Sequence, residues 1–285
     1  MARAHLIRGG AGRWAAASSS TVRRPYSEAA LFVGVWVLLG FGLRLGSDAY
    51  LLLGVPLTVA FQIGVRRRPL RELWVRGAPH FSLDGRGWLW AGALALAPAW
   101  HVARSLQEGA WISTGWWSCG VIGAGLAAFA VRSSTVGAVL RSALRPTLIG
   151  TVGMAVFYGS AHIVAGSSLD PLVLIGTIAT YVAFYFPVTF VLEEVTFRGC
   201  LDTHVDRGSN ERGSALFVSA LWGLWHLPVA GGLPLPLLVL ELLAWHILVG
   251  MPLSRAWRRG GNLAAPALAH ATIDAVRNAF MVGLG

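Results

Sequence analysis

Residues 172–198, LVLIGTIATYVAFYFPVTFVLEEVTFR, decide the fold of this chain. The part before the first glutamate carries no charged side chain and is long enough to cross a membrane as a helix. Glu193 and Glu194 follow at once, and Arg198 lies one helical turn beyond the second glutamate. A carboxylate in the middle of a membrane span costs about 2.5–3.5 kcal/mol, so such residues usually mark a pathway, a partner or a site.

The composition is typical of a polytopic membrane protein and not of a soluble domain. Hydrophobic residues make up 55% of the chain and charged residues only 13%, and the mean hydropathy is +0.61. A soluble domain cannot bury that much apolar surface. The predicted fold class is therefore all-α, with helices that cross the bilayer.

The basic charge of the chain indicates membrane topology. The formal net charge is +10, and every basic side chain other than histidine is an arginine. The arginines lie in clusters between apolar runs and do not form one face, which argues against a nucleic acid partner. Two cysteines, Cys119 and Cys200, are too few for a disulfide framework.

Apolar runs of spanning or near-spanning length predict about nine transmembrane helices, within a range of eight to ten. The runs cover residues 28–46, 48–65, 87–105, 110–131, 147–168, 171–195, 214–232, 233–251 and 262–284. Arginines fill the even-numbered loops between them and are nearly absent from the odd-numbered loops. This alternation predicts that the N-terminus and the even loops are cytoplasmic.

Three parts are distinguished along the chain. Residues 1–26 are rich in arginine and serine, which fits a cytoplasmic tail or an organelle transit peptide, and we prefer the tail. Residues 27–169 hold the N-terminal transmembrane helices, and residues 170–285 hold the membrane core with the candidate site. A short interfacial helix is expected around Leu70 to Val75, in the longest polar interval.

Helix geometry places four polar residues of the core near one depth. A polar turn follows residue 201, and Glu193 lies about as far before its middle as His226 lies after it. His270 follows a second turn, and Asp274 is one helical turn further on the same face. A common site about 10–15 Å below the cytoplasmic surface satisfies these spacings.

The two adjacent glutamates are expected to have different partners. Neighbouring residues on an α-helix point about 100° apart, so Glu193 and Glu194 are not expected to serve the same group. Arg198, at i+4 from Glu194, is the expected ion-pair partner of that residue. Glu193 is then left for chemistry, and a carboxylate in an apolar pocket suits a general base that activates water.

The remaining polar residues suit hydrolysis by such a water. His226 can share or orient the water that Glu193 activates. His270 can donate a hydrogen bond to a developing oxyanion. Asp274 can orient the imidazole of His270 or, if protonated, donate a hydrogen bond itself.

These residues form three motifs that resemble those of a known family. In order and spacing they resemble the motifs of the CPBP family, the CAAX proteases and bacteriocin-processing enzymes also called Abi proteins: Glu193-Glu194-x-x-x-Arg198, Trp222-x-x-x-His226 and His270-x-x-x-Asp274. The resemblance covers roughly residues 170–280 and implies an intramembrane endopeptidase. It also implies that Glu193 activates water with the help of His226, and that His270 and Asp274 form an oxyanion site.

Two positions bear on how closely the family pattern is followed. Trp222 stands where the family usually has phenylalanine, and we expect this exchange between two large aromatic wall residues to matter little. The last motif position is aspartate or asparagine in the family, and here it is the aspartate Asp274.

Structural interpretations stay open for these motifs when each is taken alone. Glu193, Glu194 and Arg198 also fit a salt-bridged helix end, and Arg277, at i+3 from Asp274, also fits a simple ion-pair partner. A different class of protein, a non-catalytic immunity or transporter-like membrane protein, would use the same polar cluster to bind or to join helices.

No cofactor is expected, but zinc is an alternative. Glu193, His226 and His270 supply the one carboxylate and two imidazoles of a catalytic zinc site, although the usual zinc-protease signature is absent. Glu241 and His246, in a later apolar run, are interpreted as polar contacts between helices; a place for Glu241 in the substrate cavity is the alternative.

The expected partners are a protein or peptide substrate in the membrane and the lipid bilayer itself. Members of the CPBP family process prenylated CAAX tails, leader peptides of bacteriocins or C-terminal sorting tails of surface proteins. The absence of lysine suggests a GC-rich genome. This favours a bacterial plasma membrane, and a leader or sorting tail over a prenylated one.

Overall fold

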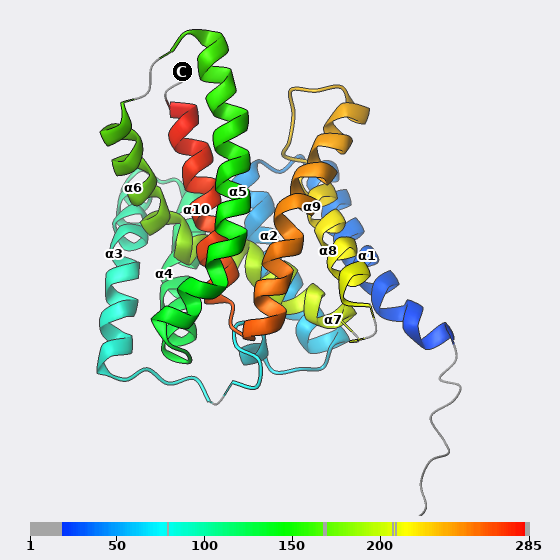
Figure 1. Cartoon of the computed structure of the whole chain (residues 1–285). Helices are drawn as coiled ribbons and strands as arrows, with labels where there is room; N and C mark the ends of the chain where they lie inside the picture. The colour runs from blue at the N-terminus through cyan, green and yellow to red at the C-terminus, as the bar shows by residue number, and fades with distance from the viewer. Residues whose placement is uncertain (1–18, 79, 168–169, 207, 209, 283–285) are drawn as a thin grey trace, which may run out of the picture.

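The fold is built from helices, as the apolar runs predict (Figure 1). The structure is a computed structural model that describes residues 19–78, 80–167, 170–206, 208 and 210–282. Helix makes up 83% of it, and no strand occurs in the described residues. The elements are α1 Ser19–Gly42, α2 Ser47–Ala60, η1 Phe61–Val65, η2 Leu70–Leu73, α3 Gly85–Gln107, α4 Trp111–Arg132, α5 Val136–Ala165, α6 Pro171–Thr189, η3 Phe190–Asp202, α7 Thr203–Val205, α8 Glu211–Trp225, α9 Leu235–Gly260 and α10 Ala264–Val282.

Six helical segments of the described chain are long and apolar enough to cross a membrane, by length and composition. They are Arg24–Gly42, Ser47–Val65, Trp111–Arg132, Val136–Ala165, Pro171–Val205 and Leu235–Gly260. The chain is therefore a polytopic helical membrane protein, as predicted. The structure does not support the predicted count of about nine spans, although the other three apolar runs also form helices, α3, α8 and α10.

The position of α8 and α10 in the bundle accounts for part of this difference. α8 has 15 residues, which span about 22 Å, less than the hydrocarbon thickness of about 30 Å. α10 packs against α5 and α6, and most of its residues are buried. A helix that neighbours cover needs less lipid-facing apolar surface, so its sequence is a poor guide to whether it spans.

Two local predictions near the N-terminus have different outcomes. α1 begins at Ser19, so residues 19–26 of the predicted cytoplasmic tail are helical; residues 1–18 lie outside the described residues, and the tail stays a prediction. The short helix expected around Leu70 to Val75 is present as η2, a 3-10 helix over Leu70–Leu73. A backbone hydrogen bond of 3.0 Å from Leu263 to Trp74 ties this loop to the start of α10.

The helices alternate in direction, so the arginine clusters gather at one end of the bundle, the lower end in Figure 1. We call this end, where α3, α5 and α8 begin and α4 and α9 end, the arginine-rich end. The opposite end, with the α1–α2, α3–α4, α5–α6 and α8–α9 connections, is the arginine-poor end. This arrangement is the one that positive-inside topology requires; a cytoplasmic location for the arginine-rich end stays a prediction.

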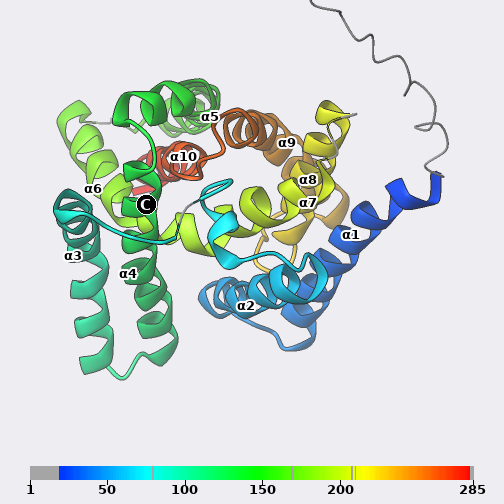
Figure 2. The same ribbon diagram turned by 90° about the horizontal axis from the view of Figure 1, so that it is seen from below.

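The segment that follows α6 lies in the middle of the bundle, as the view from below in Figure 2 shows. Pro187 lies near the end of α6 and has no N–H to continue the α-helical hydrogen bonding. From Phe190 to Asp202 the chain winds as a π-helix, in which the hydrogen bonds join i and i+5. Such segments are rare and frequently lie at functional sites.

Close contacts hold η3 against the N-terminal half of the chain. Gly199 lies against the backbone carbonyl of Leu73, where a Cβ atom would clash. The hydroxyl groups of Thr196 and Thr58 lie 2.6 Å apart and join η3 to α2. Residues before position 170 therefore contact the core directly, as small and hydroxyl residues allow between membrane helices; the predicted domain boundary stays a prediction.

Candidate active site

Glu193 lies in the first turn of η3 and faces α8. Its Oε2 atom accepts a hydrogen bond of 3.0 Å from the indole Nε1 of Trp222. The side chain is 14% exposed and lines a cavity of about 490 Å³. The carboxylate is therefore fixed by the indole on one side and open to the cavity on the other.

Glu194 is fully buried and lies between Arg198 and His270. Its Oε2 atom is 3.4 Å from Nε of Arg198, so the predicted ion pair is present. Its Oε1 atom is 2.9 Å from Nδ1 of His270 on α10. Glu194 therefore joins η3 to α10, a contact that the sequence analysis did not predict.

The prediction that the two glutamates have separate partners is wrong. His270 also presents Nε2 to Glu193, at 4.0 Å from Oε2. One cause is the imidazole ring, whose two nitrogens can face two carboxylates. The other is the winding of η3, because a π-helix turns by less per residue than the 100° of an α-helix.

Asp274 lies between His270 and Arg277 on α10. Its Oδ2 atom lies 3.4 Å from Nε2 of His270, and its Oδ1 atom lies 3.2 Å from Nη1 of Arg277. The ion pair with Arg277 and the contact with His270 therefore occur together, and a function for the latter stays a prediction. Asp274 also lines the cavity that reaches Glu193.

His226 is near the site but is held by a different group from the one expected. Its Nδ1 lies 2.9 Å from the carbonyl oxygen of Trp222. Because a carbonyl oxygen only accepts, Nδ1 carries the proton and Nε2 is the acceptor of a neutral ring. Among the described residues no hydrogen bond joins His226 to Glu193, so a shared water stays a prediction.

His246 of α9 belongs to the same cluster. It forms the interhelical contact that the sequence predicts. The centroid of its imidazole lies 4.3 Å from that of His226 and 4.6 Å from that of Trp222. What the sequence did not reveal is that these partners are motif residues. Glu241, one turn earlier, is exposed and does not line the cavity at Glu193.

Trp222 contacts residues of all three motifs. Its indole donates the hydrogen bond to Glu193. The guanidinium of Arg198 lies over the same indole, with Cζ 4.7 Å from the ring centroid, which is cation–π geometry. The centroid of His270 lies 4.9 Å away on another side. The indole is therefore a central contact of the site and more than an aromatic wall.

Six of the fourteen residues that line the cavity beside Glu193 carry aromatic or imidazole rings. The imidazole of His101 stacks on Trp117, with centroids 4.1 Å apart. The lining comprises Asp48, Leu51, His101, Trp116, Trp117, Tyr181, Phe184, Tyr185, Val188, Thr189, Leu192, Glu193, Asp274 and Arg277. We call it the aromatic cavity.

The aromatic cavity leads away from the arginine-rich end. Its residues on α2, α3 and α4 all belong to the halves of these helices that lie toward the arginine-poor end. The sequence analysis placed the site a short distance below the arginine-rich surface, which implied access from there. In the structure the space at Glu193 extends in the opposite direction.

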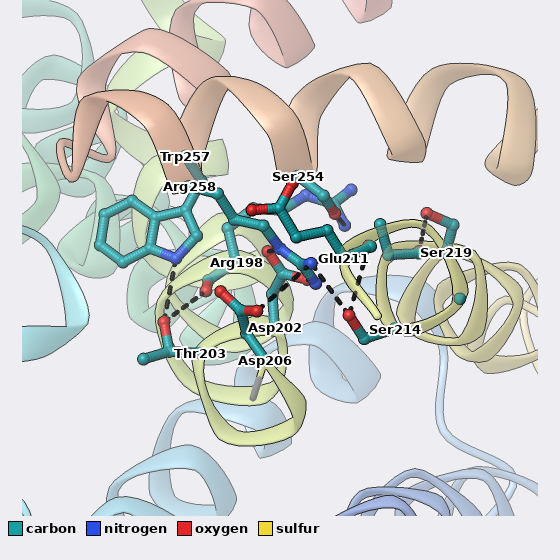
Figure 3. A network of polar contacts seen from close by, with 12 residues as sticks. Arg198, Asp202, Thr203, Asp206, Glu211, Ser214, Ser219, Ser254, Trp257 and Arg258 are labelled. Carbon is teal, nitrogen blue, oxygen red and sulfur yellow. Dashed lines mark hydrogen bonds and ion pairs between the residues drawn. The ribbon is translucent and has the colours of Figure 1, made fainter. Parts of the chain in front are cut away.

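At the arginine-rich end, a polar cluster joins η3, α8 and α9 (Figure 3). Arg258 donates to both carboxylate oxygens of the buried Asp202, at 2.5 Å and 3.1 Å, and to the hydroxyl of Ser214 at 2.9 Å. Trp257 donates to Thr203 at 2.9 Å. We call these residues, with Asp206 and Ser254, the Arg258 cluster.

The zinc alternative stays a prediction for these side chains. Within the described residues, no group of three or more His, Cys, Asp or Glu side chains has the geometry to hold a metal ion. His270 directs both ring nitrogens at carboxylates, and His226 uses Nδ1 for a backbone carbonyl. A carbonyl or carboxylate at one ring nitrogen is also the usual neighbour of a zinc-binding histidine, so these contacts do not decide against a metal.

The order and geometry of these motifs agree with a comparison against protein families. Residues 176–276 match the family model described as type II CAAX prenyl endopeptidase Rce1-like. These residues form an Rce1-like domain of the CPBP family. None of the curated proteins or solved structures that were compared matches the chain.

The Rce1-like domain covers the three motifs but not the whole site. It includes η3, α8, α9 and the part of α10 that carries His270 and Asp274. The part of the aromatic cavity formed by α2, α3 and α4 lies before it in the chain. The match indicates a CAAX-type intramembrane protease family, and with it a protein or peptide substrate.

Proposed function

We propose that this protein is an intramembrane endopeptidase in which Glu193 activates the attacking water. One observation carries the proposal: the Glu193 carboxylate is held by Trp222 at the wall of a cavity that Asp274 also lines. A carboxylate fixed on one side and open on the other is placed to take a proton from a water. Nε2 of His270 lies 4.0 Å from the same oxygen, so it is placed to donate a hydrogen bond to the oxyanion that forms beside Glu193.

The proposed reaction needs only water and the peptide bond. Glu193 takes a proton from water while the water oxygen forms a bond to the carbonyl carbon. The carbonyl oxygen becomes an oxyanion that accepts a hydrogen bond from His270, which Asp274 and Glu194 orient. The C–N bond then breaks, and the proton on Glu193 passes to the leaving nitrogen to give a carboxylic acid and an amine, which ionise to a carboxylate and an ammonium group. His226 shares the attacking water through Nε2.

The substrate is proposed to reach Glu193 through the aromatic cavity, from the arginine-poor end. With the N-terminus in the cytoplasm of a bacterial plasma membrane, this end faces outward. A lining rich in tryptophan, tyrosine and phenylalanine suits an apolar peptide segment at the membrane interface. This supports a leader or sorting tail of a membrane-associated protein as the substrate class.

The decisive experiment compares peptide termini in membranes of cells that express the wild-type chain, Glu193→Gln or Glu241→Gln. Glu193→Gln keeps the size of the side chain and an oxygen for Trp222 but removes the base. Glu241→Gln is the matched control, because it also removes a carboxylate from a membrane helix but lies outside the cavity. We expect a set of cut ends that is lost in Glu193→Gln and kept in Glu241→Gln.

Two other outcomes would decide against parts of the proposal. If Glu193→Gln keeps all cut ends, Glu193 is not the base. If even the wild-type chain adds no cut ends to those of cells that lack it, while it is folded and abundant, the non-catalytic immunity or transporter-like function is favoured. Chelation with 1,10-phenanthroline is expected to leave cleavage unchanged, and loss with recovery on zinc addition would point to a metal mechanism.

A further inference from the structure

A second cavity lies at the arginine-rich end, where α1, η1 and η2 meet α7. Its volume is about 1070 Å³, twice that of the aromatic cavity. Five of its lining residues are arginines: Arg24, Arg66, Arg67, Arg68 and Arg76. We call it the basic cavity. It shares no lining residue with the aromatic cavity.

The carboxylates in the basic cavity leave much of this positive charge unpaired. Glu28 binds Arg24 at 2.8 Å and His204 at 2.9 Å, and Asp206 lies 3.8 Å from Arg76. The consecutive residues Arg66, Arg67 and Arg68 form no ion pair in the described part of the chain. The cavity is also lined by Glu72, so five arginines face three carboxylates, and this excess of positive charge attracts an anion.

The turn that carries these three arginines is held in an uncommon conformation. Arg67 has a φ of 53°, in the left-handed region that residues other than glycine seldom adopt. The buried Gln62 fixes the turn, because its side chain donates to the carbonyl of Pro69 at 2.9 Å and accepts from Arg66 at 2.6 Å. The arginines are thus presented by an ordered turn after η1.

An apolar groove adjoins the basic cavity on the lipid-facing surface of α1 and α2. It has a volume of about 310 Å³ and is lined by Glu28, Leu31, Phe32, Val35, Leu57, Ala60, Phe61 and Val65. Glu28 and Val65 line both the groove and the basic cavity. Leu31, within the groove, is 69% exposed. A charged cavity therefore continues directly into an apolar channel along the helices.

We propose that the basic cavity and the apolar groove together bind one anionic phospholipid. Its phosphate lies among Arg66, Arg67 and Arg68, and one acyl chain follows the groove between α1 and α2. The arginines complement the negative headgroup, and the position of both parts at one end of membrane-spanning helices matches the interface of a bilayer. A soluble anion would use the arginines but would leave the groove empty. This proposal does not depend on proteolysis.

The test is equilibrium binding to the purified full chain in a neutral detergent, followed by native mass spectrometry and by the thermal unfolding midpoint. The probes are dioleoyl phosphatidylglycerol, dioleoyl phosphatidylcholine and sn-glycerol 3-phosphate. We expect phosphatidylglycerol to bind and to raise the midpoint. Phosphatidylcholine and glycerol phosphate are expected to bind at least tenfold more weakly, because one lacks the net charge and the other lacks the acyl chain.

Variants separate the two halves of the site. The double substitution Arg67→Gln with Arg68→Gln is expected to weaken phosphatidylglycerol binding about thirtyfold, from the usual contribution of each basic residue near an anionic headgroup. Leu31→Trp, which fills the groove, is expected to weaken it about tenfold. The matched control is Arg141→Gln with Arg145→Gln, two exposed arginines of α5 at the same end, and it is expected to bind as the wild type does.

Three results would overturn the proposal. Equal binding of phosphatidylcholine would show that charge does not select the ligand. Equal binding of glycerol phosphate would show a site for a soluble anion and no lipid. Wild-type affinity in the Arg67/Arg68 variant, or an equal loss in the Arg141/Arg145 control, would place the lipid elsewhere on the arginine-rich end.

Discussion

The indole nitrogen of Trp222 donates a 3.0 Å hydrogen bond to Oε2 of Glu193. Phenylalanine, the usual residue of the family motif at this position, has no donor to make that contact. A hydrogen bond to a charged acceptor contributes about 1.5–3 kcal/mol, and here it also fixes the direction in which the carboxylate faces the aromatic cavity. The exchange expected to matter little therefore adds a polar contact to the site.

Replacing this tryptophan tests that contact directly. Trp222→Phe is expected to lower kcat about 10- to 100-fold with little change in KM, because the carboxylate loses its orienting donor but the cavity keeps its shape. Cleavage of an identified substrate by purified protein measures both constants. Trp245→Phe, in α9, is the matched control and is expected to keep wild-type kinetics. An unchanged kcat in Trp222→Phe would make the hydrogen bond irrelevant to the reaction.

The two adjacent glutamates are expected to differ in what they stabilise. Glu194 is fully buried between Arg198 and His270, so Glu194→Gln leaves the buried guanidinium of Arg198 without its carboxylate. Breaking a buried ion pair from one side costs about 3–5 kcal/mol. Glu194→Gln should therefore lower the thermal unfolding midpoint strongly, whereas Glu193→Gln should leave it nearly unchanged. Equal midpoints for the two variants would contradict this division.

The contact of Gly199 with the carbonyl of Leu73 predicts a steric effect. In Gly199→Ala the added methyl group must displace a backbone atom, which costs about 1–3 kcal/mol as overpacking. The variant should unfold at a lower temperature in detergent than the wild type. Gly176→Ala is the control, since nothing lies near the position of its Cβ atom, and its midpoint should not fall. A stable Gly199→Ala would mean that η2 can move away from η3.

The direction of the aromatic cavity can be tested by labelling. Leu51→Cys, in a Cys119→Ala background, places a thiol in the cavity, while the buried Cys200 stays unreactive. A membrane-impermeant maleimide added outside intact cells should label Leu51→Cys. The exposed Arg67, at the opposite end, provides the control variant Arg67→Cys, which should react only after the cells are opened. The reverse pattern would place the opening of the cavity on the cytoplasmic side.

Much of the candidate site could be predicted from spacing, because helix geometry fixes which residues share a face. The i+4 pairs Glu194–Arg198 and His270–Asp274 are both present as predicted. Segment composition was enough to recognise membrane helices. It was not enough to count spans, because helices such as α10 are covered by neighbours that the sequence of the helix does not reveal.

What spacing could not predict depends on departures from a straight α-helix. The sequence analysis treated residues 171–195 as one regular span, but the π-helical winding after Thr189 turns Glu193 and Glu194 toward one histidine. The contact of His246 with the site could not be predicted from spacing either, because it depends on how α9 crosses α8. The bonds of Arg258 to Asp202 join residues far apart in the chain, and no local pattern signals them.

The Arg258 cluster bears on the ion permeability of the membrane. The aromatic cavity brings water-accessible space from one end of the bundle to Glu193, in the middle of the protein. If the other end were also open, protons and other ions would pass through and the membrane potential would fall. The buried bond of Arg258 to Asp202 joins the helix ends on the far side of that space. A closed helix end of this kind is what a membrane protein with an internal water-accessible site needs if the membrane is to hold its ion gradients.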